Sequence, residues 1–311
     1  MKFTSRREFL KILGIAGAGT LTGLSALAIQ DNGIRRLTIL HTNDVHSRLD
    51  PYPDNDPNYP GMGGFARRAT VVRQQRRLDP ELLLVDAGDI FQGTPYFNMF
   101  GGKPELKLMS KMGYDASAFG NHEFDNGLDG FLEVLEYAKF PFLSANYDFS
   151  RTILKGKVPA YKTLVKNGIK VGLYGLGIDP EGLVSRDLYG DTRYLDPVEK
   201  ARETEEILKE KYDCELIVCL SHLGYKYSSD RVSDVVVARN TRHTDIIVGG
   251  HTHDLLKEPA VEKNMRDMPV YIGQAGYGGV YIGLMEVTLH QGAGEKFVES
   301  NTTKIYESQG V

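Results

Sequence analysis

The chain has 311 residues, of which 41% are hydrophobic and 25% charged, and its formal net charge at pH 7 is −4. A chain of this length and composition can bury a sizeable core as one large domain or two small ones. The negative balance argues against nucleic acid or an anionic membrane surface as its main partner.

Residues 1–28 have the form of a twin-arginine export signal. The run Ser5-Arg6-Arg7-Glu8-Phe9-Leu10-Lys11 precedes a stretch rich in Gly and Ala, and Ala26-Leu27-Ala28 has the pattern of a cleavage site. The alternative is a membrane anchor, but the stretch has 17 residues with four glycines and is marginal for crossing a bilayer. We therefore predict cleavage, no stable membrane span afterwards, and a periplasmic or extracellular protein exported by the twin-arginine route.

Short apolar runs typical of buried strands alternate with helical patterns along the rest of the chain. The strands are predicted at Leu37–His41, Leu82–Asp86, Ala116–Phe119, Val171–Leu176, Leu216–Leu220, Ile246–Val248, Val270–Ile272 and Tyr281–Leu289. Helices are predicted from Pro104 to a stop at Gly113, around Leu128–Leu135, and from the cap Asp196-Pro197 to about Lys211. This alternation predicts an α/β fold, with ligands bound at the strand ends.

A basic run, two cysteines and an irregular loop are interpreted as structural features. The basic run Arg67, Arg68, Arg73, Arg76 and Arg77 is interpreted as the solvated face of a helix. Cys214 and Cys219 are placed on opposite faces of one strand, about 16 Å apart, which is too far for a disulfide. Residues 50–64 form an irregular loop that either borders the active site or is a plain surface loop.

Polar motifs follow five of the predicted strands. Their candidate metal ligands are Asp44, His46, Asp89, Asn121, His222, His251 and His253. Oxygen and nitrogen ligands without cysteine favour an open catalytic metal pair over structural zinc. Two divalent ions and two carboxylates leave the site positively charged when a hydroxide is bound, which favours an anionic ester. Because these ligands interleave through the chain, we expect a single domain over residues 33–311.

Several of these motifs resemble the calcineurin-like metallophosphoesterases, and within them the 5′-nucleotidase branch. The matching segments are Leu40–His46 (LHTNDVH), Gly88–Tyr96 (GDIFQGTPY), Gly120–Asp125 (GNHEFD), Pro141–Asn146 (PFLSAN) and Gln274–Gly276 (QAG). The resemblance implies a four-layer αββα sandwich of the metallophosphoesterase type. It also implies two divalent metal ions, which could be Zn, Mn, Fe or Co.

The resemblance assigns the site residues to separate roles. The first metal would be held by Asp44, His46, Asp89 and His253, and the second by Asp89, Asn121, His222 and His251. Asp89 would bridge the two ions. His122 would be the catalytic histidine and not a ligand, and Asp125 would orient it. One departure is His253, where some members carry an amide.

The implied reaction is hydrolysis of a small phosphate monoester, with 5′-nucleotides favoured, by a metal-bridging hydroxide. The alternatives are a phosphodiesterase or sulfur-ester hydrolase of the same branch, or a non-catalytic partner-binding subunit. The family's nucleotidases continue into a second domain that stacks the nucleobase. We therefore expect this chain alone to discriminate poorly among nucleotides; strong selectivity would require a separate chain that covers the pocket, or a lid formed by residues 50–64.

Four residues near the motifs are expected to have supporting roles. Asn43 is expected to support the turn at Asp44, Asp86 to hydrogen-bond the following loop, and His41 to be packed. Glu123 either supports the site or is a polar residue at a helix start.

Overall fold

The structure is a computed structural model that describes residues 34–290 and 296–304, which belong to one compact unit. The predicted export signal lies outside the described residues and stays a prediction. Among the helices that the structure describes, none has the length and apolarity to cross a membrane.

The first sheet has six strands in the order β14-β13-β1-β2-β3-β4. Strands β1 to β4 are parallel to one another, whereas β13 runs antiparallel to both β1 and β14. The bounds are β1 Ile34–Thr42, β2 Leu83–Asp86, β3 Ala116–Ala118, β4 Phe142–Leu143, β13 Tyr281–His290 and β14 Lys296–Lys304.

The second sheet also has six strands, in the order β11-β12-β10-β9-β7-β6. The four central strands are parallel, and β6 and β11 pair antiparallel at the two edges. The bounds are β6 Tyr161–Lys166, β7 Ile169–Gly177, β9 Leu216–His222, β10 Ile246–Gly249, β11 Ala260–Lys263 and β12 Pro269–Gly273. A small ribbon joins β5 (Tyr147–Asp148) to β8 (Arg193–Tyr194). All eight strands predicted from the sequence are present, with ends that coincide or differ by up to three residues.

The three predicted helices are also present, and local chemistry sets their ends. The described helices are α2 Phe65–Leu78, α3 Pro95–Phe100, α4 Lys103–Met112, α5 Gly127–Leu135, α6 Arg186–Tyr189, α7 Pro197–Glu206 and α8 Asp234–Asn240, with a 3-10 turn η2 at His122–Phe124 and a π-helical turn η3 at Ile207–Lys211. Helix α4 ends at Gly113 in the left-handed conformation, which glycine adopts without strain. The Asp196 side chain caps α7 by accepting hydrogen bonds from the backbone N–H groups of Val198 and Glu199.

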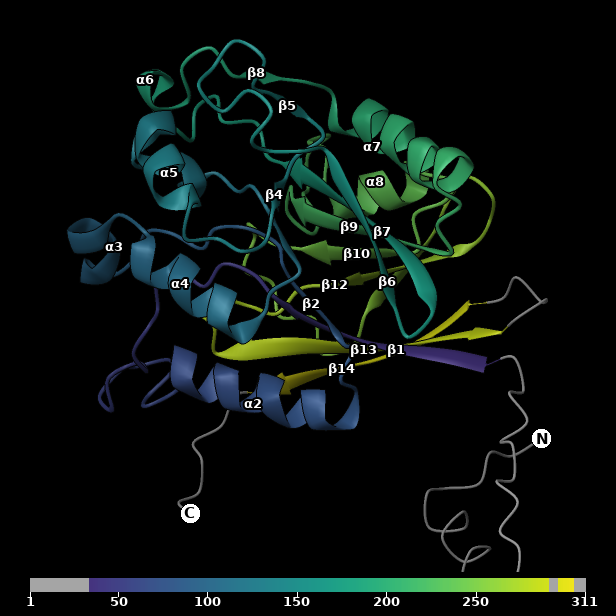
Figure 1. Ribbon diagram of the computed structural model, residues 1–311, viewed down its shortest axis with the longest axis horizontal. Coiled ribbons are helices and arrows are strands. Elements are labelled where there is room, and N and C mark those ends of the chain that lie inside the picture. Colours follow the sequence, from purple (N-terminus) through teal and green to yellow (C-terminus); the bar gives the residue numbers. More distant parts are fainter. Residues whose placement is uncertain (1–33, 291–295, 305–311) are drawn as a thin grey trace, which may run out of the picture. The chain divides into compact units, whose positions relative to one another are not determined.

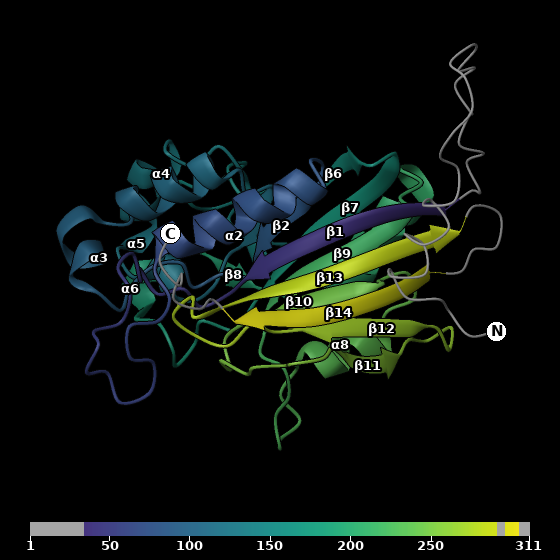
Figure 2. The same ribbon diagram turned by 90° about the horizontal axis from the view of Figure 1, so that it is seen from below.

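The two sheets pack face to face, and helices cover both outer faces (Figures 1 and 2). Between the sheets, Leu37 and Ile39 of the first sheet share a buried cluster with Val171 and Leu216 of the second. Helices α2, α4 and α5 pack against the outer face of the first sheet. Helices α7 and α8 pack against the outer face of the second sheet, which completes the four expected layers.

Two interpretations drawn from the sequence are wrong. Arg68 does not belong to a solvated face, because its side chain is fully buried on α2, stacks on Phe65 and donates a hydrogen bond of 3.0 Å to the carbonyl of Arg48. Cys214 lies before β9 begins and shares one buried cluster with Cys219, so the two do not lie on opposite faces of a strand. Both thiols are free, as expected.

Candidate metal centre

The seven candidate ligands gather at one edge of the sandwich because the strands before them are parallel. Five strands of the two sheets end at this edge, namely β1, β2, β3, β9 and β10. The loop after each strand, or its last residue, carries the candidate ligands. The structure therefore brings together residues that lie more than 200 positions apart in the chain.

The first cluster contains Asp44, His46 and His253. The Nε2 atom of His253 lies 3.3 Å from Nε2 of His46 and 3.3 Å from Oδ1 of Asp44. Ligands that bind one cation at about 2.0–2.1 Å in tetrahedral geometry lie about 3.3 Å from one another. The side chain of His253 is 40% exposed, so this cluster is open to small molecules from solvent.

The second cluster contains Asp89, His222 and His251, and Asn121 adjoins it. The Nε2 atom of His222 lies 3.0 Å from Oδ2 of Asp89, and Nδ1 of His251 lies 2.9 Å from Oδ1 of Asn121. The Nε2 atom of His222 is buried without a hydrogen-bond partner, while its Nδ1 lies 2.7 Å from the carbonyl of Ala87. When the neutral ring donates its Nδ1–H to the carbonyl of Ala87, its Nε2 carries a lone pair that points towards the carboxylate of Asp89. A cation between these two groups would accept electron pairs from both of them.

The negative charges around His222 also favour a bound cation. Burial lowers the pKa of His222, but the negative charges of Asp89 and Asp44 outweigh it and raise that pKa to about 10. The pocket thus stabilises positive charge between the imidazole and the carboxylates. A divalent ion in this position would take the place of the proton.

Asp89 belongs to the second cluster and also lies close to His46 of the first. Its Oδ2 atom lies 3.0 Å from Nε2 of His222 and 3.9 Å from Nε2 of His46. Burial alone would raise the pKa of Asp89, but His222 and His122 lower it well below its ordinary value. Its other oxygen, Oδ1, accepts a hydrogen bond of 2.9 Å from the backbone N–H of His122. This carboxylate is therefore held in place between two groups of nitrogen ligands.

His122 lies beside the clusters and pairs with Asp125. Its Nδ1 atom is 2.8 Å from Oδ2 of Asp125, and its ring makes an edge contact with the ring of His46. Burial opposes protonation of His122, but the hydrogen bond to Asp125 and the charge of Asp89 raise its pKa to about 9. The distances also group His122 with His46 and Asp89 as possible ligands of one ion. The geometry thus permits either a proton-holding role or a ligand role.

Five of the candidate ligands have left-handed backbone conformations. Their φ angles are 49° at Asp44, 45° at His46, 55° at Asp89, 71° at His251 and 57° at His253. Such angles are uncommon outside glycine, although Asp and His tolerate them better than most residues. Strain of this kind is concentrated at functional sites, where surrounding contacts hold it in place.

Two glycines of the motifs are required by close packing around the ligands. A Cβ atom at Gly120 would overlap Oδ1 of Asp89, and one at Gly250 would lie 2.9 Å from Nδ1 of His222. Any larger residue would displace a ligand. These positions explain why glycine precedes Asn121 and His251 in the two motifs.

The predicted supporting residues have the expected contacts. The Asn43 side chain donates hydrogen bonds to Asp44 and to the carbonyl of Gly276, and accepts one from the N–H of Ala275. Asp86 accepts a hydrogen bond of 2.9 Å from the N–H of Gly88. His41 is buried in the sheet, against Gly283.

Glu123 has a larger role than its sequence position indicated. Its side chain is 1% exposed and accepts hydrogen bonds from the backbone N–H groups of Asp89, Ile90 and Gly120. It therefore ties the loop after β2 to the loop after β3. The sequence contained a signal for this role, because Glu123 lies within the motif Gly-Asn-His-Glu.

Tyr277 is a site residue that the sequence reasoning missed. Its ring centroid lies 4.6 Å from that of His253 and 5.1 Å from that of His46. The only signal was its position directly after the Gln274–Gly276 segment.

A two-sheet α/β sandwich with oxygen and nitrogen ligands on the loops at its carboxyl edge defines a metallophosphoesterase framework. The chain belongs to the calcineurin-like phosphoesterase family, whose match covers residues 37–255. It is 36% identical over 280 residues to a snake venom 5′-nucleotidase from Gloydius brevicauda, a match that covers 82% of this chain and 45% of that protein. It is 33% identical over 293 residues to a 5′-nucleotidase from Homo sapiens, with 88% of this chain and 50% of that protein covered.

Among solved structures, the 5′-nucleotidase precursor from Thermus thermophilus superposes with a TM-score of 0.78 and 35% identity, covering 86% of this chain and 54% of that one. The chain spans about half the length of the curated relatives it matches. These similarities support a metal-dependent phosphoric ester hydrolase. They lend no support to the separate nucleobase-binding chain expected from the sequence.

Proposed function

We propose that this protein hydrolyses phosphate monoesters, with 5′-nucleotides as preferred substrates, at a pair of divalent cations. The first cation would be held by Asp44, His46, Asp89 and His253, and the second by Asp89, Asn121, His222 and His251. The observation that carries this proposal is the position of Asp89, whose Oδ2 atom faces the imidazoles of both clusters at 3.0 and 3.9 Å. The names of the relatives support nucleotides as the substrate class.

The cations, when bound, would neutralise charge on the phosphate and make a shared water molecule acidic enough to supply hydroxide near neutral pH. The chain's own residues would bind and orient the substrate. With only two carboxylates among the seven ligands, the centre stays electropositive and attracts a phosphate dianion. His122 would hold a proton near the leaving oxygen, and Asp125, 2.8 Å from its Nδ1, would fix the ring so that Nε2 faces the substrate.

A substrate panel tests the proposal directly. Purified protein loaded with Mn, Zn, Fe or Co is assayed against nucleoside 5′-monophosphates, a simple aryl phosphate, an aryl phosphodiester and a sulfur ester. We expect monoester hydrolysis to exceed diester and sulfur-ester hydrolysis by about 100-fold or more in kcat/KM, which corresponds to about 2.7 kcal/mol. A preference for the diester or the sulfur ester would refute the monoester assignment. Metal-loaded protein without activity on any ester would favour a non-catalytic subunit.

We also propose that residues 1–28 direct export by the twin-arginine route, which places the mature protein in the periplasm or outside the cell. The proposal rests on the Arg6-Arg7 pair and the apolar stretch that follows it. The double variant Arg6→Lys and Arg7→Lys should leave uncleaved precursor in the cytoplasm, as measured by fractionation and immunoblotting. Unchanged export of this variant would indicate a different route.

A further inference from the structure

Residues 274–278 directly follow β12 and lie against the first cluster of candidate ligands; we name them the strap. The strap contains the motif segment Gln274–Gly276 and the aromatic residue Tyr277. None of its five residues is a candidate ligand, and the proposed reaction gives them no role. Their hydrogen bonds and ring contacts nevertheless join them to the loops that carry the first cluster.

One set of strap contacts holds Asp44. The N–H of Ala275 donates to Oδ1 of Asn43 at 2.7 Å, and Nδ2 of Asn43 donates to the carbonyl of Gly276 at 2.8 Å. The same Nδ2 atom donates to Oδ2 of Asp44 at 2.6 Å. The N–H of Gly278 donates to the carbonyl of Asp44 at 2.8 Å. The strap therefore holds the backbone of Asp44 directly and its carboxylate through Asn43.

A second set of strap contacts holds the loop of His253. Oε1 of Gln274 accepts hydrogen bonds from the hydroxyl of Thr252 at 3.2 Å and from the N–H of Asp254 at 3.0 Å. These two residues directly flank His253. The N–H of Gly276 donates to the carbonyl of Asp254 at 2.9 Å. Because the Gln274 side chain is buried, water cannot readily replace the acceptor that it provides.

The Tyr277 ring packs against two imidazoles of the first cluster. Its centroid lies 4.6 Å from that of His253 and 5.1 Å from that of His46. The Tyr277 hydroxyl takes part in none of the hydrogen bonds found within residues 34–290 and 296–304, so the contact is made by the ring itself. Packing of this kind limits the rotation of both imidazoles.

The second cluster is held by other parts of the chain. Nδ1 of His222 lies 2.7 Å from the carbonyl of Ala87, and Oδ1 of Asp89 accepts a hydrogen bond of 2.9 Å from the N–H of His122. Among the described residues, no hydrogen bond or ring contact joins the strap to a member of the second cluster. A change in the strap can therefore disturb one cluster without directly disturbing the other.

We propose that the strap positions Asp44, His46 and His253 and thereby sets the affinity of the first cation separately from that of the second. All three residues contact the strap, and the fourth residue proposed for the first cation, Asp89, is shared between the two sites. This inference rests on the two-cation centre of the proposed function. It extends that function by making Gln274 and Tyr277 positioning residues for one of the two cations.

Two changes in the strap test this inference. Tyr277→Ala removes the ring that packs on the imidazoles, whereas the conservative variant Tyr277→Phe keeps it. Gln274→Leu has a similar volume but offers no acceptor to the hydroxyl of Thr252. The Tyr277 pair decides the outcome if Gln274→Leu does not fold.

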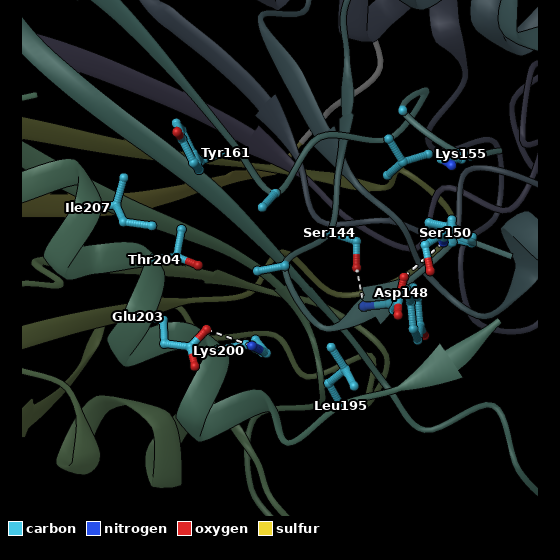
Figure 3. A pocket seen from close by; sticks show the side chains of 16 residues that line it. Ser144, Asp148, Ser150, Lys155, Tyr161, Leu195, Lys200, Glu203, Thr204 and Ile207 are labelled. Atoms are coloured by element: carbon cyan, nitrogen blue, oxygen red, sulfur yellow. Dashed lines mark hydrogen bonds and ion pairs between the residues drawn. The ribbon is translucent and has the colours of Figure 1, made fainter. Parts of the chain in front are cut away.

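Tyr161→Ala is the matched control. Tyr161 is half-buried like Tyr277, and its ring centroid lies 5.6 Å from that of Tyr212. It lies in the wall of a cavity of about 430 Å³ (Figure 3). None of the residues that line this cavity is a candidate ligand. The control therefore removes a similar ring contact at a place outside the strap and the metal centre.

The readout is the pair of dissociation constants obtained when Mn²⁺ is titrated into the metal-free proteins in a calorimeter. In Tyr277→Ala and Gln274→Leu we expect one of the two constants to rise by about 10–100-fold, as is usual when a group that orients a metal ligand is lost. The other constant should stay within about two-fold of wild type, and both should do so in Tyr277→Phe and Tyr161→Ala.

A variant that lacks a ligand of the first cation identifies the weakened site. His253→Ala removes such a ligand, so the tight binding that remains in it belongs to the second cation. Adding Tyr277→Ala to His253→Ala should leave this remaining constant unchanged. A further rise in the double variant would place the effect of Tyr277 at the second cation and overturn the inference.

Two other results would also overturn the inference. They are wild-type values of both constants in Tyr277→Ala and Gln274→Leu, and equal weakening of both binding steps in these variants. The titrations use no substrate, so they are independent of the hydrolysis assay. Two-ion binding that depends on the strap, in a protein that hydrolyses no ester, would refute the proposed function alone. Monoester hydrolysis by the wild type, with both constants unchanged in the strap variants, would refute the strap inference alone.

Discussion

The substitution Glu123→Gln tests whether the loops of the centre are held by a buried carboxylate. Glu123 accepts hydrogen bonds from the N–H groups of Ile90 at 2.8 Å, Asp89 at 3.0 Å and Gly120 at 2.6 Å. A glutamine keeps one oxygen for Asp89 and Gly120, but its NH₂ group then faces the N–H of Ile90. One buried donor loses its acceptor, which costs about 1–3 kcal/mol.

This cost predicts both a thermal and a functional effect. For a domain of this size, 1 kcal/mol lowers Tm by about 2–4 °C, so we expect a fall of roughly 2–12 °C. Because the displaced backbone carries Asp89, metal affinity should also fall, by about 10–100-fold, as is usual when a group that orients a metal ligand is lost.

Glu205→Gln is the matched control. Glu205 is also 1% exposed and accepts hydrogen bonds from the N–H groups of Arg242, His243 and Thr244. These groups precede the amino end of β10, whereas the candidate ligands follow its carboxyl end. We expect a similar fall in Tm without a change in metal affinity.

The two effects are measured by thermal unfolding of the metal-free proteins and by calorimetric titration with Mn²⁺ and Zn²⁺. Wild-type metal affinity in Glu123→Gln would refute the positioning role. Equal losses of affinity in Glu123→Gln and Glu205→Gln would mean that general destabilisation, and not the position of Asp89, explains the result.

Three further predictions follow from the same geometry. His122→Asn should keep both metal ions by elemental analysis and lower kcat by about 10²–10⁴-fold; loss of an ion would make His122 a ligand. Gly120→Ala should abolish tight metal binding in calorimetric titrations, because its Cβ overlaps Asp89; wild-type affinity would contradict the packing argument. Removing the metal with a chelator should lower Tm, because a free metal concentration of 100 Kd stabilises the folded chain by about 2.7 kcal/mol. An unchanged Tm in a scanning calorimeter would argue against a bound ion.

The sequence predicted the central strands well because buried parallel strands are short apolar runs. It missed β8 and the edge strands β6 and β11, whose residues are partly or largely exposed and do not form apolar runs, and it missed the edge strand β14. It also missed β4 and β5, which have only two residues each. The short strands β4, β5 and β8 depend on pairing partners elsewhere in the chain, whereas β6 and β11 pair with the strand that directly follows each of them.

The candidate ligands were predictable because each polar motif follows a strand. Their left-handed backbone conformations were not, since a φ of 55° at Asp89 is imposed by contacts between loops and not by local propensity. Burial of Arg68 was missed for a related reason. A charged residue in a basic run is normally solvated, and Arg68 is removed from water by its contacts with the Phe65 ring and with the carbonyl of Arg48.

The number of metal ions bound to the wild type and to Asp89→Ala tests the central claim most directly. Elemental analysis after equilibrium dialysis measures this number, with the surface variant Asp129→Ala on α5 as control. Our account predicts two ions per chain in the wild type and in Asp129→Ala, and loss of both in Asp89→Ala together with essentially all turnover. Two tightly bound ions in Asp89→Ala would contradict it.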